Sequence, residues 1–223
     1  MDKLIIVKIG GQVIDDESRL NSFLKDFAAI GHKKILVHGG GKLATRLAGQ
    51  LNIPQTLVQG RRITDAETLK IITMVYAGYI NKNIVAQLQS RGCNAIGLSG
   101  ADGNAIQAHK RVHATIDYGF AGDIDSINTG LFQTILNAGL TPIIAPVTHD
   151  GKSQLLNTNA DTIAQEIAKW LSKLYETVLV YSFEKPGVLL DVNDETSVIN
   201  QLGSLDYYEL KSNGVIAEGM IPK

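Results

Sequence analysis

The chain has 223 residues, of which 44% are hydrophobic and 19% are charged, so it can bury a core and is far from the composition of disordered chains. Its 21 basic and 22 acidic residues leave a net charge of −1, which gives no field that would attract nucleic acid or an anionic membrane. The single cysteine, Cys93, cannot form an internal disulfide, and we recognise neither a signal peptide nor an apolar run of the roughly 20 residues that cross a membrane. We therefore expect a cytoplasmic protein with small-molecule partners and no nucleic-acid or membrane partner.

Four short apolar runs predict buried strands. They are rich in β-branched residues on both faces, which is typical of parallel strands covered on both sides, and they span residues 4–9, 34–37, 141–145 and 177–181. Between them, apolar residues recur every three or four positions, which indicates helices. The alternation of strands and helices predicts an α/β fold around a mainly parallel sheet.

The longest helix is predicted over residues 64–91. Thr64 and Glu67 have the spacing of a capping box, and Gly92 can end a helix. Its length and its apolar face indicate packing against something large, either the sheet or a second subunit. Short segments broken by glycines over residues 97–130 predict hairpins beside the main sheet, which we interpret as a lid.

Two glycine-rich segments each follow a predicted strand. In Lys8–Gly11 (KIGG) a lysine precedes paired glycines, and ligands of open parallel sheets bind beyond the carboxyl ends of the strands. In His38–Lys42 (HGGGK) the glycines lie before a helix N-terminus, which favours negative charge. Both segments indicate anion binding, although a tight turn explains the first segment equally well.

The second segment is not a Walker A loop, because Leu43 follows the lysine where Ser or Thr is needed. Gly39, Gly41 and Ala44 do satisfy the GxGxxA form of the dinucleotide fingerprint, so an NAD-dependent oxidoreductase is an alternative. That fingerprint also needs an acid at a strand end about 20 residues later, and none is found there. His38 is interpreted as a packed histidine rather than a base or a ligand.

Three further features are candidates for binding or catalysis. Arg62 offers a planar fork for a carboxylate or phosphate, although a solvated surface arginine is the commoner interpretation. The segment Asn157–Asp161 (NTNAD) leads into a helix, and helix capping explains one or two of its polar residues but not all. Asp161 could orient lysine ammonium groups. The chain ends on Glu218–Lys223 (EGMIPK), whose last lysine alone would be a solvated tail.

In this order, the segments KIGG, HGGG, GRRIT, NTNAD and GMIPK resemble the amino-acid kinase family, and within it the branch that phosphorylates N-acetyl-L-glutamate. The resemblance spans essentially the whole chain. It implies a three-layer αβα sandwich and ATP-dependent phosphorylation, with Mg²⁺, of the γ-carboxylate of N-acetyl-L-glutamate in arginine biosynthesis. Within a single kinase domain, residues 1–150 would bind the acylated amino acid and residues 151–223 would bind ATP.

The resemblance also implies roles for individual residues. Lys8 and Lys223 would stabilise the phosphoryl transition state, and Asp161 would position both ammonium groups. A carboxylate nucleophile is already ionised at neutral pH, so no general base is needed. The implied catalytic set is Lys8, Gly11, Asp161 and Lys223, without a metal ligand; the acceptor set is Gly40, Gly41, Arg62, Asn157 and Asn159, with Arg62 and Asn157 facing the α-carboxylate; the nucleotide set is Gly10, Phe183, Glu184, Gly187, Val215 and Ile216.

The chain departs from the family pattern at both ends and at one turn. The turn Ser182–Val188 lacks the usual Asp, and relatives continue beyond the last lysine, so we expect an incomplete C-terminus. Arginine-inhibited relatives carry an extra N-terminal helix, and its absence implies an arginine-insensitive homodimer. We expect the dimer contact to use the helix of residues 64–91, because of its length and its apolar face. Two alternatives stay open: N-succinyl-L-glutamate as the acceptor, selected by residues 99–127, and a non-catalytic, ligand-binding regulatory relative.

Overall fold

The computed structural model describes residues 1–58 and 61–216. Contacts divide the chain into two compact units, Met1–Ser182 and Phe183–Lys223. The two units are described separately below. Among the described residues, no helix is long and apolar enough to span a lipid bilayer.

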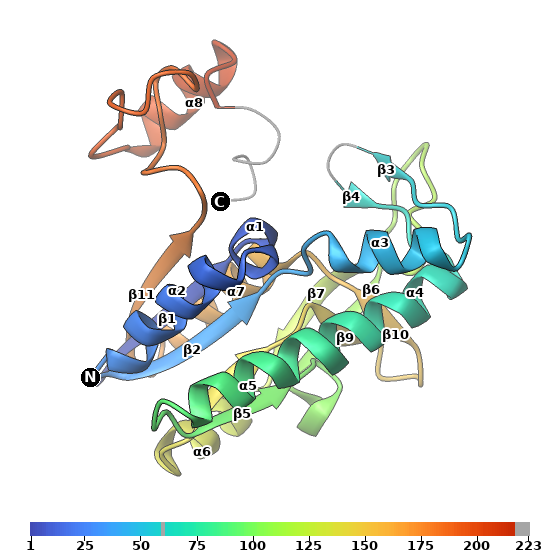
Figure 1. Cartoon of the computed structure of the whole chain (residues 1–223), viewed down its shortest axis with the longest axis horizontal. Coiled ribbons are helices and arrows are strands. Elements are labelled where there is room, and N and C mark those ends of the chain that lie inside the picture. Colours follow the sequence, from blue (N-terminus) through green and yellow to red (C-terminus); the bar gives the residue numbers. More distant parts are fainter. Residues whose placement is uncertain (59–60, 217–223) are drawn as a thin grey trace. The chain divides into compact units, whose positions relative to one another are not determined.

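A five-stranded parallel sheet forms the centre of the first unit, in the strand order β11-β1-β2-β8-β5 (Figure 1). All four predicted strands are confirmed, and a fifth was not predicted. That strand, β5, has only four residues and contains Gly97, so it was assigned to the glycine-broken hairpins. Gly97 is required there because a Cβ atom would lie 2.0 Å from Asn81 Oδ1. The strands are β1 (Lys3–Ile9), β2 (Lys33–His38), β5 (Ala95–Leu98), β8 (Thr141–Ile144) and β11 (Glu176–Ser182).

Alternate side chains of β1 enter two separate hydrophobic cores. Val7 and Ile9 pack on the face covered by α2 (Glu17–Ala29) and α5 (Asn81–Gln89), which lie in front of the sheet in Figure 1. Leu4 and Ile6 pack on the other face, which is covered by two helices, α6 (Thr129–Asn137) and α7 (Ala160–Leu171). Burial of each such side chain contributes about 1.5–3 kcal/mol. The sheet is therefore the middle layer of an αβα sandwich, as predicted.

The predicted long helix consists of three consecutive segments: α4 (Ala66–Ile72), a π-helical segment (Thr73–Ile80) and α5. Asp65, rather than Thr64, caps its start, because the Asp65 carboxylate accepts the N–H of Thr68 at 2.7 Å. The predicted capping box is wrong: the backbone N–H of Thr64 donates to Tyr118 O, and its carbonyl accepts from Phe120 N. Gly92, with a φ of +73°, ends the helix as expected.

A second sheet, with the strand order β10-β9-β6-β7, lies within residues 106–157. The predicted hairpin character is confirmed for β6 and β7, which pair antiparallel, while β6 and β9 pair parallel. The strands are β6 (Ile106–Lys110), β7 (Gly122–Ile127), β9 (Val147–His149) and β10 (Leu155–Asn157); the short β3 (Leu57–Val58) and β4 (Arg61–Arg62) form a separate pair, and the remaining helices of this unit are α1 (Gly11–Asp15), α3 (Leu43–Gln50) and a 3-10 turn at Asp102–Asn104.

The second unit is described over residues 183–216. It contains one helix, α8 (Ser204–Ser212), and an isolated antiparallel bridge between Leu189 and Val198. Gly187 lies against that bridge, since a Cβ atom on it would lie 2.8 Å from Val198 Cγ1. The N-terminus of α8 is closed by the Asp206 carboxylate, which accepts the Gly203 N–H at 2.9 Å.

Candidate active site

Lys8 and Asp161 form a buried ion pair at the carboxyl edge of the central sheet. Lys8 follows Leu4 and Ile6 in the alternation of β1, so its side chain lies on the sheet face that α7 covers. Asp161 is in the first turn of α7, where the helix dipole favours a carboxylate. The Nζ–Oδ1 distance is 2.8 Å, and the two residues are 7% and 8% exposed. The structure thus brings together two of the residues that the resemblance assigned to catalysis.

Tyr181 lies beside this ion pair, on the strand paired with β1 at the level of Lys8. Burial, together with the charge of Asp161, raises the pKa of the Tyr181 hydroxyl to about 12. The Tyr181 phenol therefore stays protonated at neutral pH and places no negative charge beside the Lys8–Asp161 ion pair.

The two glycine segments lie directly against each other. A Cβ atom on Gly11 would lie 2.6 Å from Gly41 Cα, and Gly41 has a φ of +61°, so both positions require glycine. Two of the glycine N–H groups are used inside the sheet edge: Gly10 N–H donates to Ser182 O at 3.2 Å, and Gly39 N–H donates to Ile9 O at 3.0 Å. The N–H of Gly10, assigned to the nucleotide by resemblance, thus has a strand carbonyl as its acceptor.

The middle glycine of the second segment, Gly40, lies under an aromatic ring. A Cβ atom on Gly40 would lie 1.9 Å from Cζ of Tyr76, a residue of the π-helical segment. Burial raises the pKa of Tyr76, and the nearby Arg62 guanidinium opposes that shift. Arg62 itself is held in place, because Nη2 donates to Thr45 Oγ1 at 3.0 Å and Nη1 donates to Gln55 Oε1. It is therefore an oriented arginine rather than a freely solvated one.

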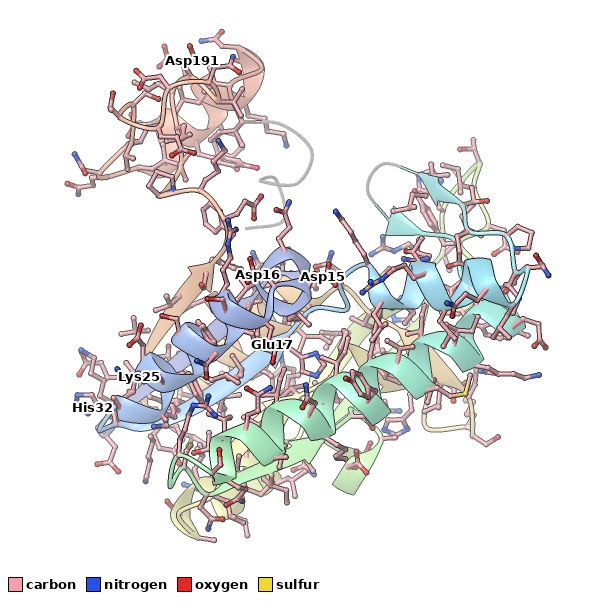
Figure 2. The ribbon with its side chains drawn as sticks, in the orientation of Figure 1. Asp15, Asp16, Glu17, Lys25, His32 and Asp191 are labelled. Carbon is pink, nitrogen blue, oxygen red and sulfur yellow. The ribbon has the colours of Figure 1, made fainter. Side chains whose placement is uncertain are left out.

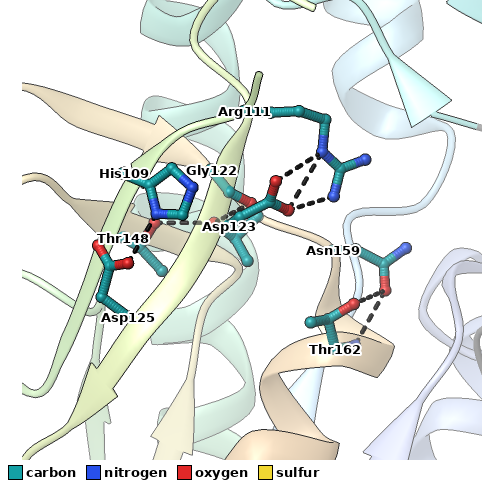
Figure 3. Close-up of polar contacts among 9 residues, drawn as sticks. His109, Arg111, Gly122, Asp123, Asp125, Thr148, Asn159 and Thr162 are labelled. Atoms are coloured by element: carbon teal, nitrogen blue, oxygen red, sulfur yellow. Dashed lines mark hydrogen bonds and ion pairs between the residues drawn. The ribbon is translucent and has the colours of Figure 1, made fainter. Parts of the chain in front are cut away.

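The NTNAD segment divides its polar residues among different tasks. Asn159 caps α7, since Oδ1 accepts the Thr162 N–H at 3.1 Å (Figure 3). Thr158 is buried, and its hydroxyl lies 2.8 Å from Thr148 Oγ1. Asn157 Nδ2 donates to Thr64 Oγ1 at 3.0 Å. Capping therefore accounts for one residue of the segment, as expected.

A cavity of about 260 Å³ joins these features. The cations Lys8, Arg62 and Arg111 and the single carboxylate of Asp161 line it, so the lining suits an anionic small molecule. Of the predicted site residues, Lys8, Gly40, Arg62, Asn157, Asn159 and Asp161 line the cavity, whereas Gly10, Gly11 and Gly41 do not. Phe183, Glu184, Gly187, Val215 and Ile216 belong to the second unit, and Lys223 lies outside the described residues.

The sequence analysis missed Arg111 and Tyr76, which also line the cavity. Arg111 follows β6, and its Nε donates to both carboxylate oxygens of Asp123 on β7 at 3.1 Å (Figure 3). A basic residue at one end of a predicted hairpin and an acid on its partner strand were the available signal. Tyr76 could not be assigned, because a regular helix drawn through residues 64–91 ignores the π-helical spacing.

The histidine at the end of β2 is a packed residue, as predicted. His38 is fully buried, and burial lowers its pKa to about 4, so the ring is neutral at pH 7. Nδ1 donates to Gly39 O at 2.8 Å, and Nε2 accepts from Asn81 Nδ2 at 3.1 Å. Within residues 1–58 and 61–216, no group of three or more His, Cys, Asp or Glu side chains could hold a metal ion.

Comparison with known proteins gives one family. The family model described as "Amino acid kinase family" matches residues 3–223. A protein of Phocaeicola vulgatus named acetylglutamate kinase is 55% identical over 222 residues, which covers 100% of this chain and 86% of that protein. Proteins of the same name from Cytophaga hutchinsonii (100% and 85% covered) and Methanopyrus kandleri (98% and 86% covered) are 55% and 36% identical.

Solved structures show the same fold. The crystal structure of smu.665 from Streptococcus mutans has a TM-score of 0.82 and 25% identity, covering 98% of this chain and 86% of that one. The N-acetylglutamate synthase of Neisseria gonorrhoeae, complexed with coenzyme A and N-acetyl-glutamate, has a TM-score of 0.77 and 21% identity, covering 94% of this chain and 47% of that one.

Proposed function

The chain belongs to the amino acid kinase family, and we propose on this premise that it transfers the γ-phosphoryl group of ATP to the γ-carboxylate of N-acetyl-L-glutamate. The product is an acyl phosphate, and the reaction serves arginine biosynthesis. The observation that carries the proposal is the cavity that gathers the Lys8–Asp161 pair, Gly40, Arg62 and Asn157. The family assignment also replaces the alternative of a dinucleotide-dependent oxidoreductase.

In the proposed reaction Lys8 stabilises the transferred phosphoryl group. Phosphoryl transfer needs positioning and compensation of charge rather than covalent help, and a preorganised donor in a water-poor site contributes about 10²–10³ in rate. The ion pair with Asp161 fixes the Nζ atom of Lys8 at one place beside the cavity. The acceptor carboxylate is ionised at neutral pH, so the site does not need a base.

The acceptor is proposed to be held at the other end of the cavity. Arg62, oriented by Thr45 and Gln55, offers a fork for the α-carboxylate, and Asn157 offers an amide beside it. Gly40 and Gly41 would contribute backbone N–H groups, and Asn159 would complete the wall at the start of α7. The role of Gly41 rests on the resemblance alone, and the other roles rest also on the position of the residues around the cavity.

ATP is the proposed phosphoryl donor. Mg²⁺ would arrive on the ATP phosphates, as is usual for this ion, and would compensate their charge. The role of Lys223 as a second catalytic lysine stays a prediction, and so do the contacts of the nucleotide with Gly10, Phe183, Glu184, Gly187, Val215 and Ile216.

Hydroxylamine trapping of the acyl phosphate tests the reaction. The purified protein, with ATP and Mg²⁺, is expected to give a hydroxamate with N-acetyl-L-glutamate and none with glutamate, and Lys8→Ala is the control that links turnover to this cavity. N-succinyl-L-glutamate is assayed in parallel, and a hydroxamate from it alone would replace the acceptor but keep the chemistry. Nucleotide binding without a hydroxamate from either acceptor would favour a non-catalytic relative.

We further propose a homodimer that uses the long helix. Met74 and Tyr79 lie on that helix and are 56% and 64% exposed, beside Leu43 and Leu47 of α3 around an apolar cavity of about 410 Å³. Sedimentation velocity is expected to give a dimer that Tyr79→Glu weakens; a monomer at micromolar concentration would contradict the proposal. A cytoplasmic location stays a prediction that cell fractionation would test.

A further inference from the structure

Asp15 joins the two glycine segments at the carboxyl edge of the sheet. It is the last residue of α1, the short helix that begins at Gly11. Its carboxylate accepts the backbone N–H of Lys42 with both oxygens, at 3.1 and 2.9 Å. It also crowds the adjacent glycine, because a Cβ atom on Gly41 would lie 2.6 Å from Asp15 Oδ1. One side chain from the helix that follows the first segment therefore clamps the backbone of the second segment.

The carboxylate of the neighbouring residue, Asp16, also accepts a backbone N–H, but in a different part of the chain. Its carboxylate accepts the N–H of Arg19 at 3.0 Å and so caps α2 (Figure 2 labels both aspartates). Both carboxylates are exposed, and each accepts a backbone N–H near a helix start. Only Asp15 binds across to another loop, and its bonds connect residues 27 positions apart.

We propose that Asp15 is a positioning residue for phosphoryl transfer: it fixes the backbone N–H groups of Gly11, Gly40 and Gly41 relative to one another. This inference rests on the proposed function. Gly11 packs against Gly41 with no room for a side chain. We therefore expect that loss of the Asp15 bonds shifts these backbones relative to each other. A shift of about 1 Å between such groups can lower a rate about a hundredfold.

The clamp also changes the interpretation of the HGGGK segment. The sequence predicts that a ligand anion binds at the N-terminus of the following helix. In the structure the carboxylate of Asp15 already bonds the Lys42 N–H just before α3. The negative charge that the helix dipole attracts is therefore supplied by the protein. Of the three glycines before the helix, Gly40 is the one that lines the cavity and has not been assigned a backbone acceptor above.

The experiment compares kcat and KM in the hydroxamate assay for the wild type, Asp15→Ala, Asp15→Asn and Asp16→Ala. Asp15→Ala is expected to lower kcat about 10–100-fold, with a smaller change in both KM values. Asp15→Asn keeps an acceptor oxygen, and Asn is as good a backbone acceptor as Asp at helix starts, so we expect kcat within about threefold of the wild type. Asp16→Ala is expected to keep kcat but to lower the melting temperature by about 2–4 °C.

Amide hydrogen exchange provides a readout that needs no turnover. The Lys42 amide is expected to exchange faster in Asp15→Ala than in the wild type, and unchanged in Asp16→Ala. If Asp15→Ala does not fold, Asp15→Glu, which displaces the carboxylate by one methylene, takes its place with the same expectations. A kcat within twofold of the wild type, or an unchanged Lys42 exchange rate, would overturn the inference. An inactive wild type with faster Lys42 exchange in Asp15→Ala would instead count against the proposed function.

Discussion

Two lysines on neighbouring strands of the central sheet are equally buried but differently used. Lys8 on β1 and Lys34 on β2 are each 7% exposed. Lys34 lies at the amino end of its strand, where Nζ donates to Ala28 O and Ile30 O, both at 2.8 Å, at the C-terminal end of α2. Lys8 lies near the carboxyl end of its strand, pairs with Asp161 and lines the cavity.

The two lysines differ in the edge of the sheet at which they lie and not in burial. The edge therefore distinguishes the candidate catalytic lysine from the structural one. At the amino edge the negative end of a helix binds the ammonium group of Lys34 and closes the site. Burial lowers the pKa of Lys34, and the nearby Cys93 only partly opposes that shift. At the carboxyl edge the glycine segments leave room, so the charge of Lys8 faces a cavity that a phosphoryl group can enter.

Exchanging the two lysines for uncharged residues should give the largest contrast. Lys8→Ala is expected to lower kcat about 100–1,000-fold, because it removes a donor that acts on the transition state. Lys34→Met is expected to keep kcat and to lower the free energy of unfolding by about 1–3 kcal/mol, because two carbonyls lose their donor. Steady-state kinetics and urea unfolding measure both. A loss of kcat in Lys34→Met that matches Lys8→Ala would remove the distinction.

Lys8→Ala leaves the Asp161 carboxylate buried without its cation, which itself destabilises a fold. The double variant Lys8→Ala/Asp161→Asn removes that charge and should regain stability. It should remain inactive, since the donor is still missing. Recovery of turnover together with stability would show that the loss in the single variant was structural.

Arg62→Ala tests the residue of the same cavity that is proposed to bind the acceptor. The KM for N-acetyl-L-glutamate is expected to rise about 10–100-fold with kcat nearly unchanged, because a carboxylate contact made by a charged fork contributes to ground-state binding. Arg19→Ala on α2, which lines neither the active-site cavity nor the apolar cavity of the proposed dimer contact, is the matched control. A normal KM with slowed chemistry would contradict the assignment.

Two glycines near α3 give a smaller contrast between the edge of the sheet and the surface. The methyl group of Gly40→Ala would overlap the Tyr76 ring, so kcat/KM is expected to fall at least about tenfold. Gly49→Ala meets no atom within 4 Å on the exposed side of α3 and is expected to stabilise the protein by about 0.5–1 kcal/mol. Kinetics and thermal unfolding of both variants check this pair. Equal kcat/KM values for the two variants would show that the Tyr76 ring moves aside at little cost.

His38 predicts a pH dependence of stability rather than of catalysis. Its folded pKa of about 4 lies below the ordinary value of 6.5, so the unfolded chain binds the proton first. The neutral ring therefore contributes stability above pH 6.5 that is lost as the pH falls toward 4, about 1–2 kcal/mol of it between pH 6.5 and 5. Urea unfolding at these two pH values should show the loss, and His38→Asn should reduce it. The same slope in both proteins would contradict this origin.

Much of the fold could be predicted because its signals are local. Apolar runs specified four strands, and the resemblance supplied the sandwich. The π-helical segment and β5 could not be predicted, because the first depends on packing and the second is short and contains a glycine. The spacing of Thr64 and Glu67 predicts a cap at Thr64. That prediction is wrong because the backbone of Thr64 bonds to residues 118 and 120, which are distant in sequence.

The candidate site was predictable to the extent that motifs carry it. Lys8, Arg62 and Asp161 stand in recognisable segments, and the structure brings them to one cavity. The sequence alone did not reveal three features, because each depends on a long-range contact. The Arg111 guanidinium binds across a hairpin, the Tyr76 ring lies over a glycine, and the Asp15 carboxylate binds from the end of α1 to the backbone just before α3.

In the proposed mechanism two residues of one cavity have separate roles: Lys8 stabilises the transferred phosphoryl group, and Arg62 holds the acceptor. Calorimetric titration of N-acetyl-L-glutamate into the Lys8→Ala variant tests this most directly. We expect a Kd within about threefold of the wild-type value although kcat has fallen about 100-fold or more. A Kd weakened by the same factor as kcat would contradict it, because Lys8 would then bind the acceptor rather than the transition state.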